Sequence, residues 1–245
     1  MSWVWVMLLA AVIASLEQGV TGFGSGIMLM IILPHLLPIG QSAGVATLTM
    51  IVAEVALTWR YRHALKPRRL VVPFIVYSVV ATWSVHLGQV LPMQILRVLL
   101  GCLLIGLAIY FLLRKSTNTQ VIPLAVAVLF WMVSGFFNGL FGIGGPLMAL
   151  YFLTLAQTKE EYLVSIQAFF LIDTCYVSLV RFATGVIGVA QLPLVAVGIV
   201  GTLIGTAIAN RIVVHLNVAA ITKVVYGFIG ISGMYYLLTA LSTRG

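Results

Sequence analysis

The sequence predicts an all-α integral membrane protein of two repeats, each with five helical segments. Hydrophobic residues make up 62% of its 245 residues, and charged residues make up only 7%. A soluble globular domain carries about 25% charged residues, so most side chains here must meet apolar surroundings. Isolated strands cannot satisfy their backbone hydrogen bonds in lipid, and we therefore expect the apolar runs to be helices.

Ten apolar runs follow one another along the chain, and each predicts one helix. A full membrane span needs about 20 residues, so the first, second and seventh runs are short and the sixth is borderline. The short runs meet in pairs at two glycine-rich joints, the first joint (residues 22–26) and the second joint (residues 142–146). The runs cover residues 3–17, 23–39, 43–59, 70–91, 95–113, 121–138, 146–156, 162–180, 190–209 and 218–241.

The first run lacks the positively charged region with which a signal peptide begins, so we expect it to be retained as a membrane segment. Cys102 and Cys175 lie inside apolar runs and predict neither a disulfide framework nor a metal site. His86 and His215 have no second ligand at metal spacing. We therefore expect no metal and no cofactor.

Basic residues crowd residues 60–69, between two apolar runs, and the net charge of the chain is +8. Such a cluster is typical of a cytoplasmic loop in a multi-pass protein of the cell inner (plasma) membrane. The basic residues do not cover a soluble face, so we expect no nucleic-acid partner.

The segment ASLEQGVTGFGSG (14–26) aligns without a gap with SGFFNGLFGIGGP (134–146), 120 residues further on. The aligned positions pair Gly19 with Gly139, Gly22 with Gly142, Gly24 with Gly144, and Gln18 with Asn138. We therefore divide the chain into an N-terminal membrane repeat, residues 1–117, and a C-terminal membrane repeat, residues 118–245. Internal symmetry of this kind is common in secondary transporters.

Two polar stripes give an independent indication of the repeat. In the third run, Thr47, Glu54, Thr58 and Tyr61 follow a spacing that places them on one helix face. The eighth run repeats the spacing 120 residues further on, with Gln167, Thr174, Ser178 and Arg181. The stripes predict a shared polar interior surface, although such side chains also simply join membrane helices through hydrogen bonds.

The basic residues leave two topologies open. If each short pair is a hairpin, the repeats are inverted and both termini lie outside. If each pair is one broken helix, there are four spans per repeat, the repeats run parallel and both termini lie inside. We favour the hairpin, because inverted repeats with broken helices recur in transporters. The hairpin topology places residues 60–69, Arg114, Lys115, Lys159 and Arg211 on one side, and Arg97, Arg181 and Arg244 on the other.

The glycine-rich joints differ from nucleotide-binding loops. GFGSGI lacks the G-x-G-x-x-G spacing, and GLFGIGGP lacks the lysine and hydroxyl residue of a P-loop. Close helix packing is one interpretation of the glycines. The interpretation that we favour is a substrate site, where two helix N-termini, one from each repeat, converge near the membrane midplane and bind an anion.

The paired motifs GFGSG and FGIGGP resemble those of the TauE/SafE sulfite exporter family, also called the 4-toluene sulfonate uptake permease family. The resemblance covers nearly the whole chain. It implies import or export of small sulfur-containing anions such as sulfite, sulfonates or sulfoacetate. Residue by residue, it points to Gly22, Gly24, Gly26, Gly142, Gly144, Gly145 and Pro146.

Ser25 stands where the second joint has Gly145, and its hydroxyl is a candidate ligand. Amide side chains beside the joints add further hydrogen-bond donors. The predicted substrate-binding residues are Gln18, Gly19, Gly22, Gly24, Ser25, Gly26, Asn138, Gly139, Gly142, Gly144, Gly145 and Pro146.

Three of the five acidic residues lie in or at the ends of apolar runs. A charge at the centre of a membrane helix costs about 2.5–3.5 kcal/mol, so it normally faces a cavity or a partner. Glu54 is the first candidate for proton coupling, and Glu17 is the second. We expect Asp173 to pair with an arginine, and residues 160–161 to be solvated. Arg181 either attracts the anion at an entrance or snorkels to the headgroups. The predicted coupling or pathway residues are Glu17, Thr47, Glu54, Gln167, Asp173 and Arg181.

Together these observations predict a secondary transporter of small sulfur-containing anions, coupled to protons and without enzymatic activity. Its expected partners are the anionic substrate, the lipid bilayer and protons. Two alternatives remain: a passive anion channel at the same site, and a membrane-embedded enzyme or enzyme subunit. The sequence offers no nucleophile–base pair or metal cluster for an enzyme.

Overall fold

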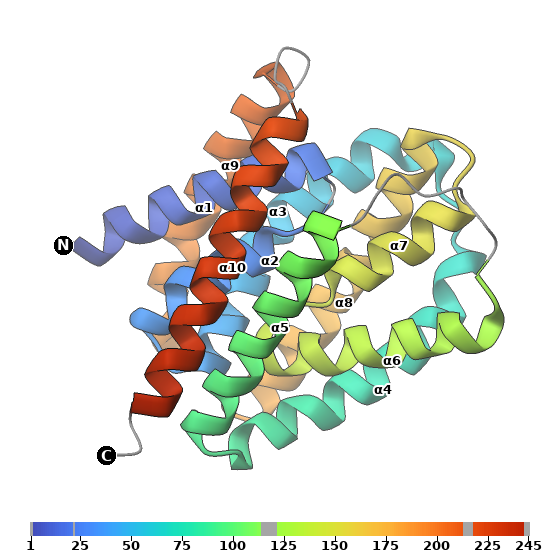
Figure 1. The fold of residues 1–245 in the computed structure, drawn as a ribbon. Helices are drawn as coiled ribbons and strands as arrows, with labels where there is room; N and C mark the ends of the chain where they lie inside the picture. The colour runs from blue at the N-terminus through green and yellow to red at the C-terminus, as the bar shows by residue number, and fades with distance from the viewer. Residues whose placement is uncertain (1, 22, 114–121, 213–217, 243–245) are drawn as a thin grey trace.

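The computed structural model describes residues 2–21, 23–113, 122–212 and 218–242 (Figure 1). These residues form ten α-helices and three short 3₁₀ helices, and no strand, so the all-helical prediction is confirmed for this part of the chain. The α-helices are α1 (Ser2–Thr21), α2 (Ser25–Ile32), α3 (Ile39–Tyr61), α4 (Arg68–Val90), α5 (Met93–Leu113), α6 (Leu124–Phe141), α7 (Gly145–Leu155), α8 (Lys159–Ala183), α9 (Leu192–Ile212) and α10 (Val218–Ser242).

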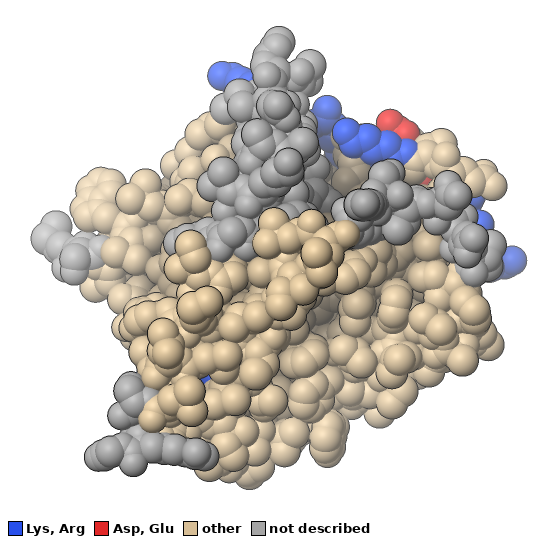
Figure 2. Space-filling model, viewed as in Figure 1, with Lys and Arg blue, Asp and Glu red and all other residues tan. Residues whose placement is uncertain are grey.

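Among the described residues, six helices are long and apolar enough to cross a membrane. Large apolar side chains lie on their outer surfaces, including Trp59 (68% exposed) and Val79 (66% exposed). On the face drawn in Figure 2, most charged side chains gather toward one end and the rest of the described surface is largely uncharged. Such an apolar surface suits lipid and not water, as expected of a multi-pass membrane protein.

Proline sets the start of several helices. Pro38, Pro67 and Pro123 immediately precede α3, α4 and α6, and Pro146 lies in the first turn of α7. Proline is tolerated there because a backbone N–H in the first turn has no partner inside the helix.

The lengths of the first two helices differ from the prediction. α1 has 20 residues, whereas α2 has only 8. The predicted run stopped at residue 17 because polar residues follow, but Glu17 and Gln18 are buried inside the protein and the helix continues through them. The truly short helices are therefore α2 and α7, and α7 has 11 residues.

The closest helix pairs join distant parts of the chain. α1 packs against α9, α4 against α6, α3 against α8, and α5 against α10. In the first pair, a Cβ added to Gly201 would lie 2.6 Å from the carbonyl oxygen of Leu8, so only glycine allows this approach. The short helices lie alongside their predecessors, since α2 contacts α1 and α7 contacts α6.

The prediction that residues 160–161 are both solvated is wrong for Glu161. Its side chain is buried, and it accepts from Lys66 Nζ at 2.8 Å and Arg69 Nη1 at 2.6 Å. The α8 start is also fixed by Thr158, whose hydroxyl accepts from the Glu161 N–H at 3.1 Å. These contacts bring the connection between α3 and α4 to the beginning of α8.

Glu161→Ala is expected to lower the thermal unfolding midpoint in detergent by about 2–5 °C, on the order of 1 kcal/mol. The loss is modest because Lys66 and Arg69 are themselves partly exposed and water can replace their partner. Tryptophan fluorescence during heating measures the midpoint. Glu160→Ala is the matched control, since Glu160 is exposed. An equal shift of the unfolding midpoint in both variants would contradict a stabilising role of the Glu161 ion pairs.

Candidate functional site

Both joints are tight turns that need glycine. Gly24, before α2, has φ 105°, and Gly142, after α6, has φ 67°. Both values lie in the left-handed region, which glycine adopts without the penalty that a Cβ brings. Gly22, the first predicted residue of the first joint, lies outside the described residues.

The structure brings the two joints together. A Cβ added to Gly26 would lie 2.5 Å from the carbonyl oxygen of Gly142, and one added to Gly145 would lie 3.2 Å from Phe23 Cβ. The turn before α2 and the turn before α7 are therefore in direct contact, although 120 residues separate them in sequence.

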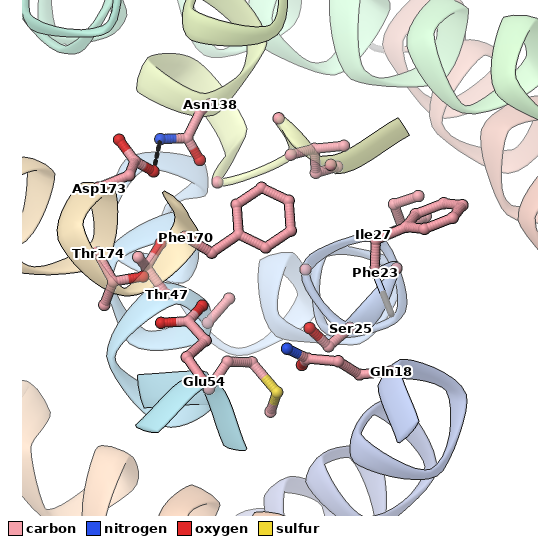
Figure 3. Close-up of a pocket in the computed structure, with 18 of the residues that line it drawn as sticks. Gln18, Phe23, Ser25, Ile27, Thr47, Glu54, Asn138, Phe170, Asp173 and Thr174 are labelled. Carbon is pink, nitrogen blue, oxygen red and sulfur yellow. Dashed lines mark hydrogen bonds between the residues drawn. The ribbon is translucent and has the colours of Figure 1, made fainter. Parts of the chain in front are cut away.

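A cavity of about 50 Å³ lies between the joints and helices α3 and α8 (Figure 3). One water molecule needs about 10–15 Å³ of such space, so the cavity holds roughly three or four water-sized groups. The predicted substrate-binding residues that line this central cavity are Gln18, Gly24, Ser25, Gly26, Asn138, Gly142, Gly144, Gly145 and Pro146. Thr47, Glu54 and Asp173 line it as well.

Two predicted binding residues lie at helix–helix contacts instead. Gly19 faces Ala209 of α9, and Gly139 faces Ala81 and Ser84 of α4. Neither glycine lines the central cavity. Close helix packing accounts for both, as in the first interpretation of the joint sequences.

The first turns of α2 and α7 face the central cavity. Ser25 and Gly26 begin α2, and Gly145 and Pro146 begin α7. The first backbone N–H groups of a helix have no partner within it, and neither helix has a side-chain cap. Each N-terminus also carries the positive end of a helix dipole. Two uncapped, positive helix ends therefore converge on one small buried space, which suits an anion.

Carboxyl groups form the opposite wall. Figure 3 shows Glu54, Asp173 and Thr174 on one side of the cavity, and Gln18 and Ser25 on the other. Glu54 is 5% exposed and Asp173 is 3% exposed. Among the described residues, Glu54 Oε2 and Asp173 Oδ1 have no hydrogen-bond partner. Charged carboxylates here would repel an anion, so their protonation state controls what the cavity can hold.

The amide residues before the two joints are both held by α8. Gln18 Nε2 donates to Gln167 Oε1 at 3.0 Å, and Asn138 Nδ2 donates to Asp173 Oδ2 at 2.8 Å. Gln167 does not line the cavity itself, but it contacts Gln18, which does. Glu17 lies behind the first joint, since a Cβ added to Gly24 would lie 2.5 Å from Glu17 Oε1.

Arg181 lies in the interior, so its predicted position among the headgroups is wrong, whereas its predicted role of attracting the anion at an entrance stays a prediction. Its side chain is 1% exposed. The chain turns back over the end of α8, where the N–H groups of Val186 and Ile187 donate to the Arg181 carbonyl oxygen at 2.9 and 3.3 Å. The guanidinium is held inside the protein, where it donates to Thr47 Oγ1 at 2.9 Å and to Asn138 O at 2.7 Å.

Asp173 does not form the expected contact ion pair. Among the described residues, ion pairs within 4.0 Å involve Glu161 and not Arg181. Asp173 instead accepts from the Asn138 amide, and Arg181 influences it over a longer distance.

Sequence reasoning missed Tyr77, which is fully buried in α4. A Cβ added to Gly144 would overlap the Tyr77 hydroxyl, so the tyrosine supports the second joint from behind. The hydroxyl also lies near Asp173. A tyrosine within a predicted membrane run was the available signal, since a buried hydroxyl needs polar surroundings.

The described residues contain no group of three or more His, Cys, Asp or Glu side chains that could hold a metal ion. Cys102 and Cys175 are free and exposed.

The family model of the sulfite exporter TauE/SafE matches residues 7–236, which include both joints. No curated protein and no solved structure matches the chain. The family is one of membrane transporters for sulfite and related sulfur anions, in agreement with the six membrane-capable helices among the described residues. The chain belongs to the sulfite exporter TauE/SafE family.

Proposed function

We propose that the protein is a proton-coupled secondary transporter that carries a small sulfur-containing anion, of the sulfite or sulfonate class, across the cell inner membrane. One observation carries the proposal: the uncapped N-termini of α2 and α7 converge on a single buried cavity. Backbone N–H groups and helix dipoles bind anions without a buried lysine.

The size of the central cavity favours a compact anion. Sulfite has three oxygen atoms around one sulfur atom, and a space for roughly three or four water-sized groups suits it. A neighbouring apolar cavity of about 210 Å³ shares Gly144 and Pro146 with the central cavity. The apolar part of an organic sulfonate fits there while its sulfonate group lies at the helix ends.

The carboxyl wall suggests how protons are coupled to the anion. Glu54 and Asp173 lie beside the place where the negative charge would bind. Two charged carboxylates would oppose that binding, whereas protonated carboxyls would not. Proton binding and anion binding therefore favour each other, and the two are carried together.

We further propose that residues 1–117 and 118–245 are inverted repeats. Exchanging the two halves converts the α1–α9 pair into the α6–α4 pair, and it leaves the α3–α8 and α5–α10 pairs unchanged. The packing of α2 on α1 and of α7 on α6 supports the hairpin interpretation, in which an odd number of segments inverts the second half.

Purified protein is expected to bind sulfite in isothermal titration, more tightly than acetate or formate. Ser25→Ala is expected to weaken sulfite binding about fivefold, because one hydroxyl in the cavity is lost. Ser15→Ala is the control, since Ser15 is also buried but its hydroxyl donates to Val12 O within α1. A folded protein that binds no sulfur anion, or an equal loss in both variants, would contradict the proposed site.

A further inference from the structure

Arg181 lies between two separate cavities. Thr47 and Asn138, whose oxygen atoms it contacts, line the central cavity. Arg181 itself lines a second cavity of about 30 Å³, together with Gly139 on the other side of the α6 end. The guanidinium therefore occupies the partition between the two spaces.

The second cavity opens toward one end of the helix bundle. Gly40 at the start of α3, Gln89 near the end of α4 and Leu96 near the start of α5 line it. Gln89 is exposed, so the cavity reaches the surface. The ion pairs of Glu161 lie at the opposite ends of α3, α4 and α8. The second cavity is thus a vestibule on the membrane side opposite to the 62–67 connection.

Neutral oxygen atoms hold the guanidinium in the partition. Arg181 Nη2 donates to Asn138 O at 2.7 Å and to Gly139 O at 3.2 Å. Arg181 Nη1 donates to Thr47 Oγ1 at 2.9 Å and to Ala43 O at 3.5 Å. These bonds join α3, α6 and α8. No carboxylate among the described residues lies within ion-pair distance of this charge.

We propose that the Arg181 guanidinium is the gate between the vestibule and the central cavity. The gate opens when the guanidinium leaves the carbonyl oxygens of Asn138 and Gly139 and takes the anion as its partner. Hydrogen bonds to an anion are stronger than bonds to neutral carbonyls, and a guanidinium can bind two oxygens of one anion at once. Protons and other cations are repelled by the same charge, so the gate limits their leakage.

This inference rests on the proposed function, and cysteine labelling tests the two separately. In a Cys102→Ala, Cys175→Ala background, Thr174→Cys places a thiol in the central cavity and Val186→Cys places one in the vestibule. Sulfonatoethyl methanethiosulfonate, an anionic thiol reagent that does not cross lipid, is added to oriented proteoliposomes from the vestibule side. Arg181→Gln is expected to accelerate labelling of Thr174→Cys at least tenfold and to leave Val186→Cys unchanged.

Equal labelling rates of Thr174→Cys with and without Arg181 would overturn the gate. Should Arg181→Gln fail to fold, Thr47→Val is used instead, because it removes one acceptor of the guanidinium. It is expected to accelerate labelling of Thr174→Cys about threefold. An unchanged labelling rate would overturn the gate. Methanesulfonate, a sulfonate that unlike sulfite does not react with the thiol reagent, is expected to slow labelling in the central cavity when it is added beforehand. Absence of that protection contradicts the proposed binding site, whereas protection without an Arg181 effect contradicts only the gate.

Discussion

Glu54→Gln is expected to abolish sulfite accumulation driven by a pH gradient, while sulfite exchange across the membrane continues. Glu54 is buried, lines the central cavity and has one carboxyl oxygen without a hydrogen-bond partner among the described residues. Glutamine keeps the shape of the side chain but cannot bind and release a proton. The substrate can therefore still enter and leave, but its movement no longer depends on the proton gradient.

Proteoliposomes with the membrane voltage held at zero give the measurement. A one-unit pH gradient drives at most about a tenfold accumulation for each coupled proton, and Glu54→Gln is expected to reduce the ratio to about one. Exposed Glu160→Gln provides the control. If Glu54→Gln vesicles still accumulate sulfite, Glu54 is not the coupling residue and Glu17→Gln is tested in the same way. If neither change matters, another group couples the protons, whereas a passive channel is the better explanation if the unaltered protein accumulates no sulfite.

Gly145→Leu is expected to eliminate sulfite binding, with an apparent Kd raised at least about 100-fold. Gly145 lines the central cavity, and an added Cβ would already lie 3.2 Å from Phe23 Cβ and 3.6 Å from Phe170 Cζ. Leucine brings four carbon atoms into a space for roughly three or four water-sized groups. Gly145 is substituted and not Gly144, because the neighbours of Gly145 are side chains that can shift. A side chain at Gly144 would displace the buried Tyr77 hydroxyl.

Gly106→Leu is the matched control for this substitution. Gly106 lies in α5, and a Cβ added there meets no atom within 4 Å. Both variants are first compared by gel filtration and thermal unfolding in detergent, and sulfite titration follows. Retained sulfite binding by folded Gly145→Leu protein would reduce the second joint to a packing element.

The helices and the joint residues could be predicted because their signals are local. Apolar runs mark membrane helices, and glycine at Gly24 and Gly142 is required by the φ angle of the residue itself. The spacing of Thr47 and Glu54 likewise placed both on one face of α3, and both line the cavity.

The environments of Glu161 and Arg181 could not be predicted, because they depend on distant segments. Glu161 lies next to other charged residues in sequence and is buried only because the chain around Lys66 and Arg69 folds over it. Arg181 stands at a helix end, where snorkelling is common, but its guanidinium donates to Thr47 of α3 and to Asn138 of α6 and stays inside. In both cases tertiary packing decides whether a charge meets water.

The long-range pairing of helices constrains how the protein is made. The ribosome releases α1 well before α9, the helix against which it packs, and α5 likewise before α10. Until then, the α1 surface that fits Gly201 must rest against lipid or an insertion factor. Each of α1, α3, α4 and α5 therefore makes its closest contact with a helix of the second half. The central cavity likewise cannot be complete before α8 is made, because Asp173 and Thr174 line it.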